Sequence, residues 1–488
     1  MWKLFQDIFA IAWEGCHIMN RQIRIKSITI DNFKNVKHGK LDFMTNKDIY
    51  SGDVIGIYGQ NGSGKTAVVD SLKLLQHMLR GNRLGKDYLG YINVDSDAMH
   101  LTYIIQIVAD HENSFVVNYS FSIKKELVDV SNNVNTEKLI NEPIYRVRIF
   151  DEELAFSETT ESSRHKQEKL VSTRATDTVL PKVKYKALVG NDDKTDEDIR
   201  LIRKQTANES RTFIFSAEFL NIVRKNCKNI RYRSILEFLV HYGNFELFTI
   251  GTQSSGLISL NALPLAFDYK DEQEKLTGQY MVPINDSADI SKKEFKMVKK
   301  LVKPINLVLK KLIPELTIEV NDLGPVLLGN TSIKGERIQL MSCKNSHQIP
   351  LKYESEGIKK IISILQLLIA VYNKSSITVA VDELDSGIFE YLLGQMLSVI
   401  SEKGKGQLIF TSHNLRPLEV LKPDKIIFTN VNPNDRYCRI NHIKKTNNLR
   451  ACYYRKIALG YGNDALYDET TSFDLALAFK KAGEYIED

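Results

Sequence analysis

One short segment constrains the fold of this chain more than any other: residues 59–66 read G-Q-N-G-S-G-K-T. They match in full the phosphate-binding loop pattern G-x-x-x-x-G-K-[ST]. The apolar residues 54–58 precede the loop and are typical of a buried strand, and residues 67–75 after it are typical of a helix. A strand, a glycine-rich loop and a helix in this order predict an α/β fold with a phosphate site at the loop.

The loop predicts a site for a nucleoside triphosphate and Mg²⁺. Its glycines allow successive backbone N–H groups to point at an anion, and the helix that follows adds the positive end of its dipole. Lys65 is expected to reach the β- and γ-phosphates, and Thr66 to ligate Mg²⁺ through its hydroxyl. The candidate nucleotide-binding residues of the loop are Gly59, Asn61, Gly62, Ser63, Gly64, Lys65, Thr66 and Ala67.

An apolar strand at 376–381 ends in two acids, a Walker B arrangement that predicts the second half of the same site. Asp382 is expected to hold Mg²⁺ through water, and Glu383 to orient or polarise an attacking water molecule. Two adjacent carboxylates at the end of a buried strand need a cation nearby, because burying unpaired charge is costly. Asp385 follows directly, in the sequence L-D-S-G.

Two further segments place polar groups where a nucleotide would lie. His413 follows the apolar strand 407–411, and ligands of parallel sheets bind at the carboxyl ends of strands, so we expect it to sense a terminal phosphate. Upstream, Ser355 and Gly357 open an apolar helix, and a Ser-x-Gly at a helix N-terminus predicts a second anion site. This second site is expected to serve a nucleotide held mainly by another subunit. The candidate catalytic residues are Lys65, Glu383 and His413, and the candidate metal ligands are Thr66 and Asp382.

Composition and charge indicate a soluble globular protein of about two to four domains. The net charge of +6 is too small to indicate nucleic-acid binding by itself. Five scattered cysteines without a C-x-x-C pair indicate neither a disulfide framework nor a zinc site, so we expect a cytoplasmic location. Residues 1–13 are partly apolar but lack a cleavage site, so we expect no signal peptide and no membrane association. They form an amphipathic extension, or translation starts at Met19.

The motifs, in this order, resemble those of the ABC-type ATPase heads: phosphate loop, Ser-x-Gly signature helix, Walker B acids, an Asp-containing loop and a switch histidine. The strand I-T-I-D-N-F-K at 28–34 resembles the first strand of SMC, RecF and overcoming-lysogenization-defect heads. The tail at 448–483 looks like that of the soluble, AAA-labelled ABC-type ATPases of bacterial phage-defence operons. These include the ATPase subunits of the PARIS, RloA/RloB and Septu-type systems. The resemblance covers most of residues 22–483, but 156–290 match no family.

The resemblance implies an α/β fold of the ABC-type P-loop ATPase head, with a mixed sheet, flanking helices, an antiparallel β subdomain and a helical insertion. It implies ATP and Mg²⁺ as ligands and a dimer in which two copies sandwich two nucleotides; a higher ring stays open. Ser355 and Gly357 would touch the γ-phosphate held by the partner, and Asp385 would communicate across the dimer. The signature reads E-S-E-G and not L-S-G-G, which leaves the role of Glu356 open. Gln106 is a weak candidate for the Q-loop glutamine.

Five regions are expected along the chain. Runs rich in β-branched and aromatic residues, at 101–108, 114–123 and 144–149, predict an antiparallel sheet, and 287–313 predict a lysine-rich amphipathic helix. The regions are an N-terminal extension (1–21), a first ATPase lobe with the phosphate loop and the β subdomain (22–155), a polar loop and helical insertion (156–314), a second lobe with the remaining motifs (315–445) and a helical tail (446–488).

Three functions are compatible with these features. The resemblance favours the sensor or scaffold subunit of an anti-phage system, whose nucleotide state controls oligomerisation and a separately encoded effector, expected to be a nuclease. A RecF- or SMC-like repair or DNA-binding ATPase is the alternative, although the insertion is too short and irregular for a long coiled-coil arm. A nuclease within this chain is the weakest, because the residues after His413 contain no D-x-D. A nucleic-acid partner stays open through basic residues that are otherwise expected to form a solvated helix face: Arg224, Lys225, Lys228, Arg231 and Arg233.

Overall fold

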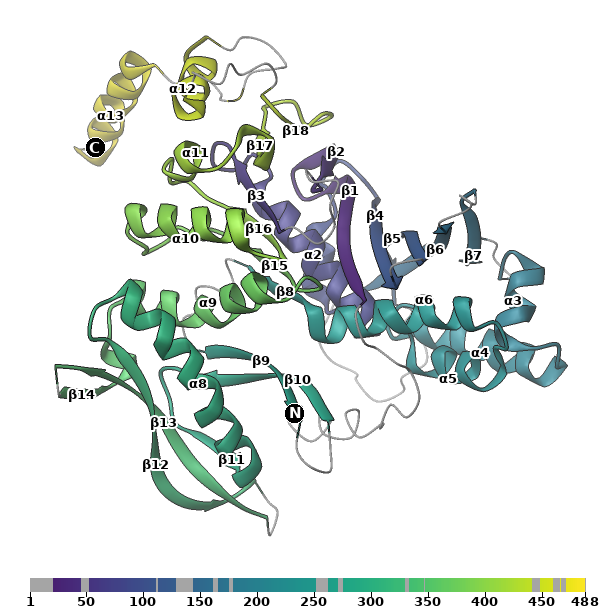
Figure 1. The fold of residues 1–488 in the computed structure, drawn as a ribbon. Coiled ribbons are helices and arrows are strands. Elements are labelled where there is room, and N and C mark those ends of the chain that lie inside the picture. The colour runs from purple at the N-terminus through teal and green to yellow at the C-terminus, as the bar shows by residue number, and fades with distance from the viewer. Residues whose placement is uncertain are drawn as a thin grey trace.

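The computed structural model of the chain describes residues 21–44, 52–110, 113–128, 144–160, 166–174, 179–251, 262–270, 275–329, 333–345, 347–440, 448–459, 466 and 471–487. Two large sheets lie on either side of α2 (Lys65–Leu79), and a smaller sheet with α8 (Lys292–Leu312) lies at one end of the molecule (Figure 1). The expected N-terminal extension lies outside the described residues, apart from Arg21.

The central sheet carries the predicted motifs, and its strands follow the order β18-β17-β3-β16-β15-β8. Its parallel strands are buried almost throughout, which explains why they read as apolar runs in the sequence. Because they are parallel, their carboxyl ends meet at one edge, and the α/β class with a mixed sheet is confirmed. The parallel strands are β17 (Ile426–Thr429), β3 (Asp53–Tyr58), β16 (Gln407–Thr411), β15 (Thr378–Val381) and β8 (Leu247–Ile250), and β18 (Tyr437–Cys438) is antiparallel to β17.

The second large sheet is antiparallel, with the order β2-β1-β4-β5-β6-β7. It contains the three runs that predicted an antiparallel sheet, so that prediction is confirmed. The turn η1 (Lys86–Tyr91) connects α2 to it. The strands are β1 (Gln22–Phe33), β2 (Val36–Asp42), β4 (Ala98–Asp110), β5 (Asn113–Leu127), β6 (Tyr145–Thr160) and β7 (Glu168–Ser172).

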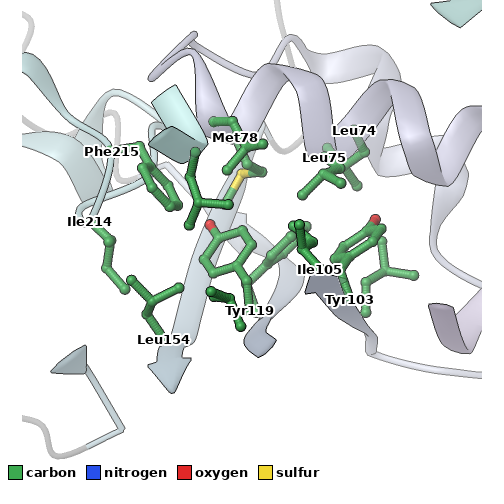
Figure 2. Packing of buried hydrophobic residues seen from close by; sticks show 14 of the residues in the cluster. Leu74, Leu75, Met78, Tyr103, Ile105, Tyr119, Leu154, Ile214 and Phe215 are labelled. Carbon is green, nitrogen blue, oxygen red and sulfur yellow. The ribbon is translucent and has the colours of Figure 1, made fainter. Parts of the chain in front are cut away.

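Helix α2 is fixed between the two large sheets by its apolar side chains. Leu75 and Met78 are fully buried and face Tyr119 of the antiparallel sheet (Figure 2). The same core continues to Ile57 and Ile409 of the central sheet. Burying one such side chain stabilises the fold by about 1.5–3 kcal/mol. Packing on both sides therefore holds the N-terminus of α2, where the phosphate loop ends, in one position.

Gln407 connects the two sheets directly. Its side chain is fully buried, and its amide donates to the carbonyl of Ile25 at 2.8 Å and accepts from the Ile25 N–H at 3.2 Å. The same amide oxygen accepts from the Thr378 hydroxyl at 3.2 Å. These bonds fix β1 relative to β16, the strand that precedes His413.

The region 156–314, expected to hold a polar loop and a helical insertion, contains strands as well. After its first helices and the π-helical turn η2 (Tyr242–Glu246), the chain returns to the central sheet as β8, and then forms a hairpin of β9 (Ala262–Lys270) and β10 (Lys275–Pro283). Strand β8 has four residues, too short a run to be told from the helical pattern before it. The first helices are α3 (Lys182–Val189), α4 (Asp193–Asn208), α5 (Ala217–Asn226) and α6 (Ile230–His241).

The lysine-rich helix begins later than the predicted residue 287. Residues 288–291 pair with a neighbouring strand as β11, and α8 starts after Ser291, which forms a capping box with Glu294. Pro304 lies inside the helix, which continues to Leu312. The sheet under α8 consists of β11 (Ala288–Ser291), β12 (Thr317–Leu327), β13 (Lys334–Lys344) and β14 (His347–Pro350).

The remaining helices follow in the second half of the chain. These helices are η4 (Leu351–Tyr353), α9 (Glu356–Asn373), α10 (Glu390–Lys403), α11 (Pro417–Val420), η5 (Pro423–Lys425), α12 (Leu449–Leu459) and α13 (Ser472–Glu487). Among all helices in the described part of the chain, none combines the length and the hydrophobicity that crossing a bilayer requires.

Candidate nucleotide-binding and catalytic site

The phosphate loop lies between β3 and α2 and is packed too closely for any residue but glycine at its start. A Cβ on Gly59 would lie 1.6 Å from the Thr429 hydroxyl oxygen, which is far inside contact distance. That hydroxyl instead donates to the Ser63 hydroxyl at 2.6 Å. Gly62 and Gly64 have φ values of 74° and 96°, in the left-handed region that favours glycine. The sequence pattern therefore reflects a tightly turned loop in this structure.

Lys65 is buried inside the loop that it ends. Its side chain is 6% exposed, and its ammonium donates to the carbonyls of Gly59 and Gln60, both at 2.8 Å. Burial lowers the pKa of Lys65, while the carboxylates of Asp382 and Glu383 oppose that shift. The ammonium therefore lies within electrostatic range of both Walker B acids, as a residue that contacts phosphate beside Mg²⁺ must.

Asp382 follows β15 and is fully buried. Its N–H donates to the carbonyl of Ile250 at 2.8 Å, which connects it to the neighbouring strand β8. Its carboxylate accepts a hydrogen bond of 2.5 Å from the hydroxyl of Thr411, the last residue of β16. The bond orients one carboxylate oxygen, and a carboxylate fixed in this way within electrostatic range of Lys65 has the chemistry of a Mg²⁺ ligand.

Glu383 has a backbone conformation that non-glycine residues rarely adopt. Its φ is 49°, and the conformation is held by two bonds to the backbone: its N–H donates to the Thr411 hydroxyl at 2.7 Å, and its carbonyl accepts from the Lys360 ammonium at 2.7 Å. Such a residue is disfavoured by about 1–3 kcal/mol and persists where its surroundings fix it. Both bonds involve backbone atoms of Glu383, and within the described ranges its carboxylate makes no hydrogen bond, although it lies within electrostatic range of Lys65 and Lys360.

Lys360 is a second buried cation at this edge, which the sequence reasoning missed. It lies in α9, is 4% exposed and has its pKa lowered by burial, against the attraction of the carboxylates of Asp385, Glu383 and Asp382. A lysine that follows a Ser-x-Gly motif by three residues is the only signal in the sequence. Through its bond to the Glu383 carbonyl, Lys360 connects helix α9, which begins at the signature motif, to the Walker B acids of the same chain.

Asp385 holds the turn that carries His413. One of its carboxylate oxygens accepts from the backbone N–H groups of His413, at 3.1 Å, and Asn414, at 2.9 Å. Among the described residues, its other oxygen, Oδ1, is buried and has no hydrogen-bond partner. His413 itself is exposed. The structure therefore gives Asp385 a positioning role within the chain, beside the role across a dimer that the resemblance implies.

The start of α9 presents Ser355 to solvent. The Ser355 hydroxyl accepts from the Ile358 N–H at 3.4 Å and so caps the helix. A Cβ on Gly357 would lie 2.2 Å from the carbonyl oxygen of Gly387, so the glycine allows close packing on the turn after Asp385. Gly357 thus has a reason to be glycine inside one chain, separate from any contact with a partner's nucleotide.

A pocket of about 490 Å³ opens beside the phosphate loop. The loop contributes Gly59, Gln60 and Asn61, and the segment after β16 contributes Ser412 and His413. The structure thus brings the phosphate loop and His413 together, as predicted from the strand ends. Ser355 does not line this pocket.

Contacts from outside the motifs complete the loop. The Tyr437 hydroxyl donates to the carbonyl of Gly64 at 2.8 Å, and the Asn35 side chain donates to the carbonyl of Gly62. Arg436 donates in turn to the carbonyl of Asn35 at 3.2 Å. None of these three residues belongs to a motif in the sequence, so the sequence analysis missed them.

The weak Q-loop candidate Gln106 is wrong. It lies within β4 and pairs with Arg24 and Val116, inside the antiparallel sheet and away from the carboxyl edge of the central sheet. Strand β8 does end at that edge, at Gly251, and the residues that follow, 252–261, lie outside the described ranges. The end of β8, which pairs with the Walker B strand β15, is therefore a position from which a further residue could reach the site.

Among solved structures, the chain is similar to an SMC head bound to the C-winged helix domain of ScpA, with 11% identity, 85% of this chain and 98% of that chain covered, and a TM-score of 0.40. It is similar to the recombination mediator protein RecF with ATP, with 13% identity, 82% and 94% covered, and a TM-score of 0.34. It is also similar to an SMC head domain from Thermotoga maritima, with 12% identity, 86% and 100% covered, and a TM-score of 0.32. At these values the similarity supports no conclusion about function.

No curated protein matches the chain. A protein-family profile, in contrast, matches residues 54–419, which are 366 of the 488 residues, and is described as "AAA domain, putative AbiEii toxin, Type IV TA system". The matched range begins just before the phosphate loop and ends after His413, so it contains every motif of the site. The chain therefore belongs to this family of AAA domains.

Proposed function

We propose that this chain binds MgATP and hydrolyses it at sites that two copies of the chain share. The observation that carries the proposal is the arrangement of the motifs. Lys65, Asp382 and Glu383 lie together at one edge of the central sheet, with His413 at the adjoining pocket. Ser355, at the second helix N-terminus with anion-binding chemistry, is exposed and lies outside that pocket. We therefore infer that a second copy of the chain brings its Ser355 to the terminal phosphate.

The residues present fit a magnesium-bound triphosphate. In the described ranges, no three His, Cys, Asp or Glu side chains are grouped so that they could hold a metal by themselves. Mg²⁺ typically keeps several waters and binds through one or two carboxylates and phosphate oxygens. Thr66 and Asp382 would hold it, and it would neutralise charge on the phosphates. Lys65 would leave the loop carbonyls for phosphate oxygens, and Glu383 would orient the attacking water.

A mixture of two inactive variants tests the shared site. The variant Lys65→Ala loses the phosphate-binding lysine and keeps Ser355. The variant Ser355→Arg loses the serine and keeps Lys65. If each site takes its phosphate loop from one copy and Ser355 from the other, half of the randomly formed pairs are mixed, and each mixed pair has one intact site. We expect the equimolar mixture to hydrolyse ATP at about a quarter of the wild-type rate, while each variant alone is nearly inactive.

The matched control is a chain with both substitutions, because mixing it with Lys65→Ala assembles no intact site. Melting temperatures of all variants show whether the loss of the Ser355 cap, worth about 1 kcal/mol, affects folding. A mixture no more active than the average of its two components would contradict sites shared between copies.

We further propose that this ATPase is the sensor or scaffold subunit of an anti-phage defence system. The resemblance of its tail and motifs supports this role, and the family's description names a toxin of a toxin–antitoxin system, in which a second component is expected. The nucleotide state would control assembly, up to a higher ring, and a separately encoded effector, expected to be a nuclease. A bound γ-phosphate that orders contacts and releases them on hydrolysis is a common switch.

Co-purification tests the effector. The tagged chain is expressed with the products of its neighbouring genes and purified with and without MgATP. We expect one neighbour, carrying nuclease motifs, to co-purify at a stoichiometry that changes with ATP. Neighbours that belong to recombination, with none retained on the chain, would contradict the defence role.

A DNA-binding ATPase of the RecF or SMC kind is the second candidate, and one observation favours it. Helix α8 carries a stripe of lysines along one side, with the spacing of a single helix face: Lys292, Lys296, Lys299, Lys303 and Lys310. Within this stripe Lys292 pairs with Glu336 at 3.7 Å, and three of the five basic residues expected in the preceding helices are paired too: Arg231 with Glu158, and Arg224 and Arg233 with Glu237. Salt-dependent binding of duplex DNA by the isolated chain would favour this candidate.

A further inference from the structure

The pocket beside the phosphate loop has a wall that none of the sequence motifs contributes. Besides the loop and the segment carrying His413, it is lined by Tyr453, Tyr454 and Ile457 of α12, in the C-terminal tail. We place the γ-phosphate at this side of the loop, because Lys65, which is expected to reach the β- and γ-phosphates, has its ammonium at the carbonyls of Gly59 and Gln60. Helix α12 therefore lies at the γ-phosphate end.

In the described part of the chain, helix α12 is attached to the ATPase body through an aromatic stack, an ion pair and apolar side chains. The Tyr453 ring is 7% exposed and stacks on Phe428 of β17, with ring centres 4.9 Å apart. Arg450 forms an ion pair of 2.9 Å with Glu419 of α11. Leu449 is buried in the same core. A surface ion pair contributes little, so among these contacts the aromatic stack and the apolar side chains contribute most.

The wall has the chemistry to distinguish an occupied pocket from an empty one. Tyr454 lines the pocket and is 51% exposed, with the Arg450 guanidinium over its ring at 6.0 Å, so about half of its surface stays open to a group in the pocket. Among the described lining residues there is no carboxylate, which would repel phosphate, and the polar groups are amides, hydroxyls and one imidazole. A γ-phosphate with its water molecules would meet hydrogen-bond donors from the loop on one side and from α12 on the other.

We propose that the position of α12 depends on the nucleotide bound to the same chain. A γ-phosphate in this pocket stabilises the docked position of α12, and loss of the γ-phosphate on hydrolysis to ADP weakens docking. A ligand shifts an equilibrium only by its differential affinity for the two states, and here the difference is the contact with Tyr454. The tail, which continues to the exposed helix α13, thereby acquires a position that depends on the phosphate (Figure 1). This inference rests on the proposed binding of ATP.

Hydrogen exchange tests this coupling in the full chain. Backbone exchange in residues 449–459 is measured without nucleotide, with MgADP and with the slowly hydrolysed analogue ATPγS. We expect exchange to be slower with ATPγS than with ADP, by about fivefold or more. The measurement is repeated with Ser355→Arg, which prevents shared sites. If the protection disappears in this variant while ATPγS still binds, a second copy covers α12. That result would overturn the proposal that the nucleotide of the same chain stabilises α12.

Linkage provides an independent measurement, because coupling is reciprocal. Tyr454→Ala removes the exposed side chain from the wall without opening the core, and is expected to weaken ATPγS binding by about fivefold or more while ADP binding stays within about twofold. Lys456→Ala, at an exposed position of the same helix, is the matched control and should change neither. Wild-type ATPγS affinity in Tyr454→Ala, with unchanged exchange in α12, would overturn the inference and leave ATP binding intact. A wild-type chain that binds neither nucleotide would overturn both.

Discussion

Replacing Lys65 by alanine is expected to weaken binding of MgATP by about 30-fold or more, because hydrogen bonds to charged groups contribute about 1.5–3 kcal/mol each. Lys65 is 6% exposed, and its ammonium already lies inside the loop, where it donates to the carbonyls of Gly59 and Gln60. Its transfer to phosphate oxygens requires little reorganisation. Titration with a fluorescent ATP analogue, in the presence of Mg²⁺, measures the loss.

Lys73→Ala is the matched control for this substitution. Lys73 lies on the same helix, is partly buried and does not belong to the loop. The substitution Lys73→Ala should leave the affinity for MgATP unchanged. An affinity of Lys65→Ala within about threefold of wild type, at an unchanged melting temperature, would contradict the assignment of the loop as the triphosphate site.

The motifs and the sheet that carries them were predictable because their signals are contiguous. The phosphate loop, the Walker B strand and the strand before His413 each consist of an apolar run followed directly by a polar group. Such a pattern is typical of a buried parallel strand with a site at its carboxyl end. The edge at which Lys65, Asp382 and Glu383 gather follows from that pattern and from the order of the motifs alone.

The residues that orient these groups were not predictable, because they act across long separations in the sequence. Thr411 reads as one more position of an apolar strand, yet its hydroxyl bonds both Asp382 and Glu383 across the β15–β16 pair. Lys360 reads as part of a lysine pair on a helix, and only the packing of α9 places it against the carbonyl of Glu383. Neither partnership has a local signature.

Short and mixed segments limited the prediction of the fold for a related reason. Strand β8 follows a run of helices and has too few residues to show a period. Residues 288–291 form a strand only because β13 lies beside them, so the predicted helix began too early. In both places a pairing partner distant in the sequence decided the structure, as is usual for strands.

Replacing Glu383 by glutamine is expected to lower the rate of ATP hydrolysis by about 100-fold or more, the usual contribution of a positioned general base. The bonds that hold this residue, to Thr411 and Lys360, involve its backbone, so the amide should leave the fold and ATP binding unchanged. Release of phosphate measures the rate. Glu390→Gln, an exposed acid at the start of α10, is the matched control and should hydrolyse ATP normally.

The most direct test of shared nucleotide sites is the molar mass of the Glu383→Gln chain, measured by size-exclusion chromatography with light scattering. Because this variant binds ATP without consuming it, we predict twice the mass of one chain in MgATP, or a higher multiple if rings form, and the mass of one chain without nucleotide. A chain that demonstrably binds ATP and keeps the mass of a single copy would contradict a site built by two copies.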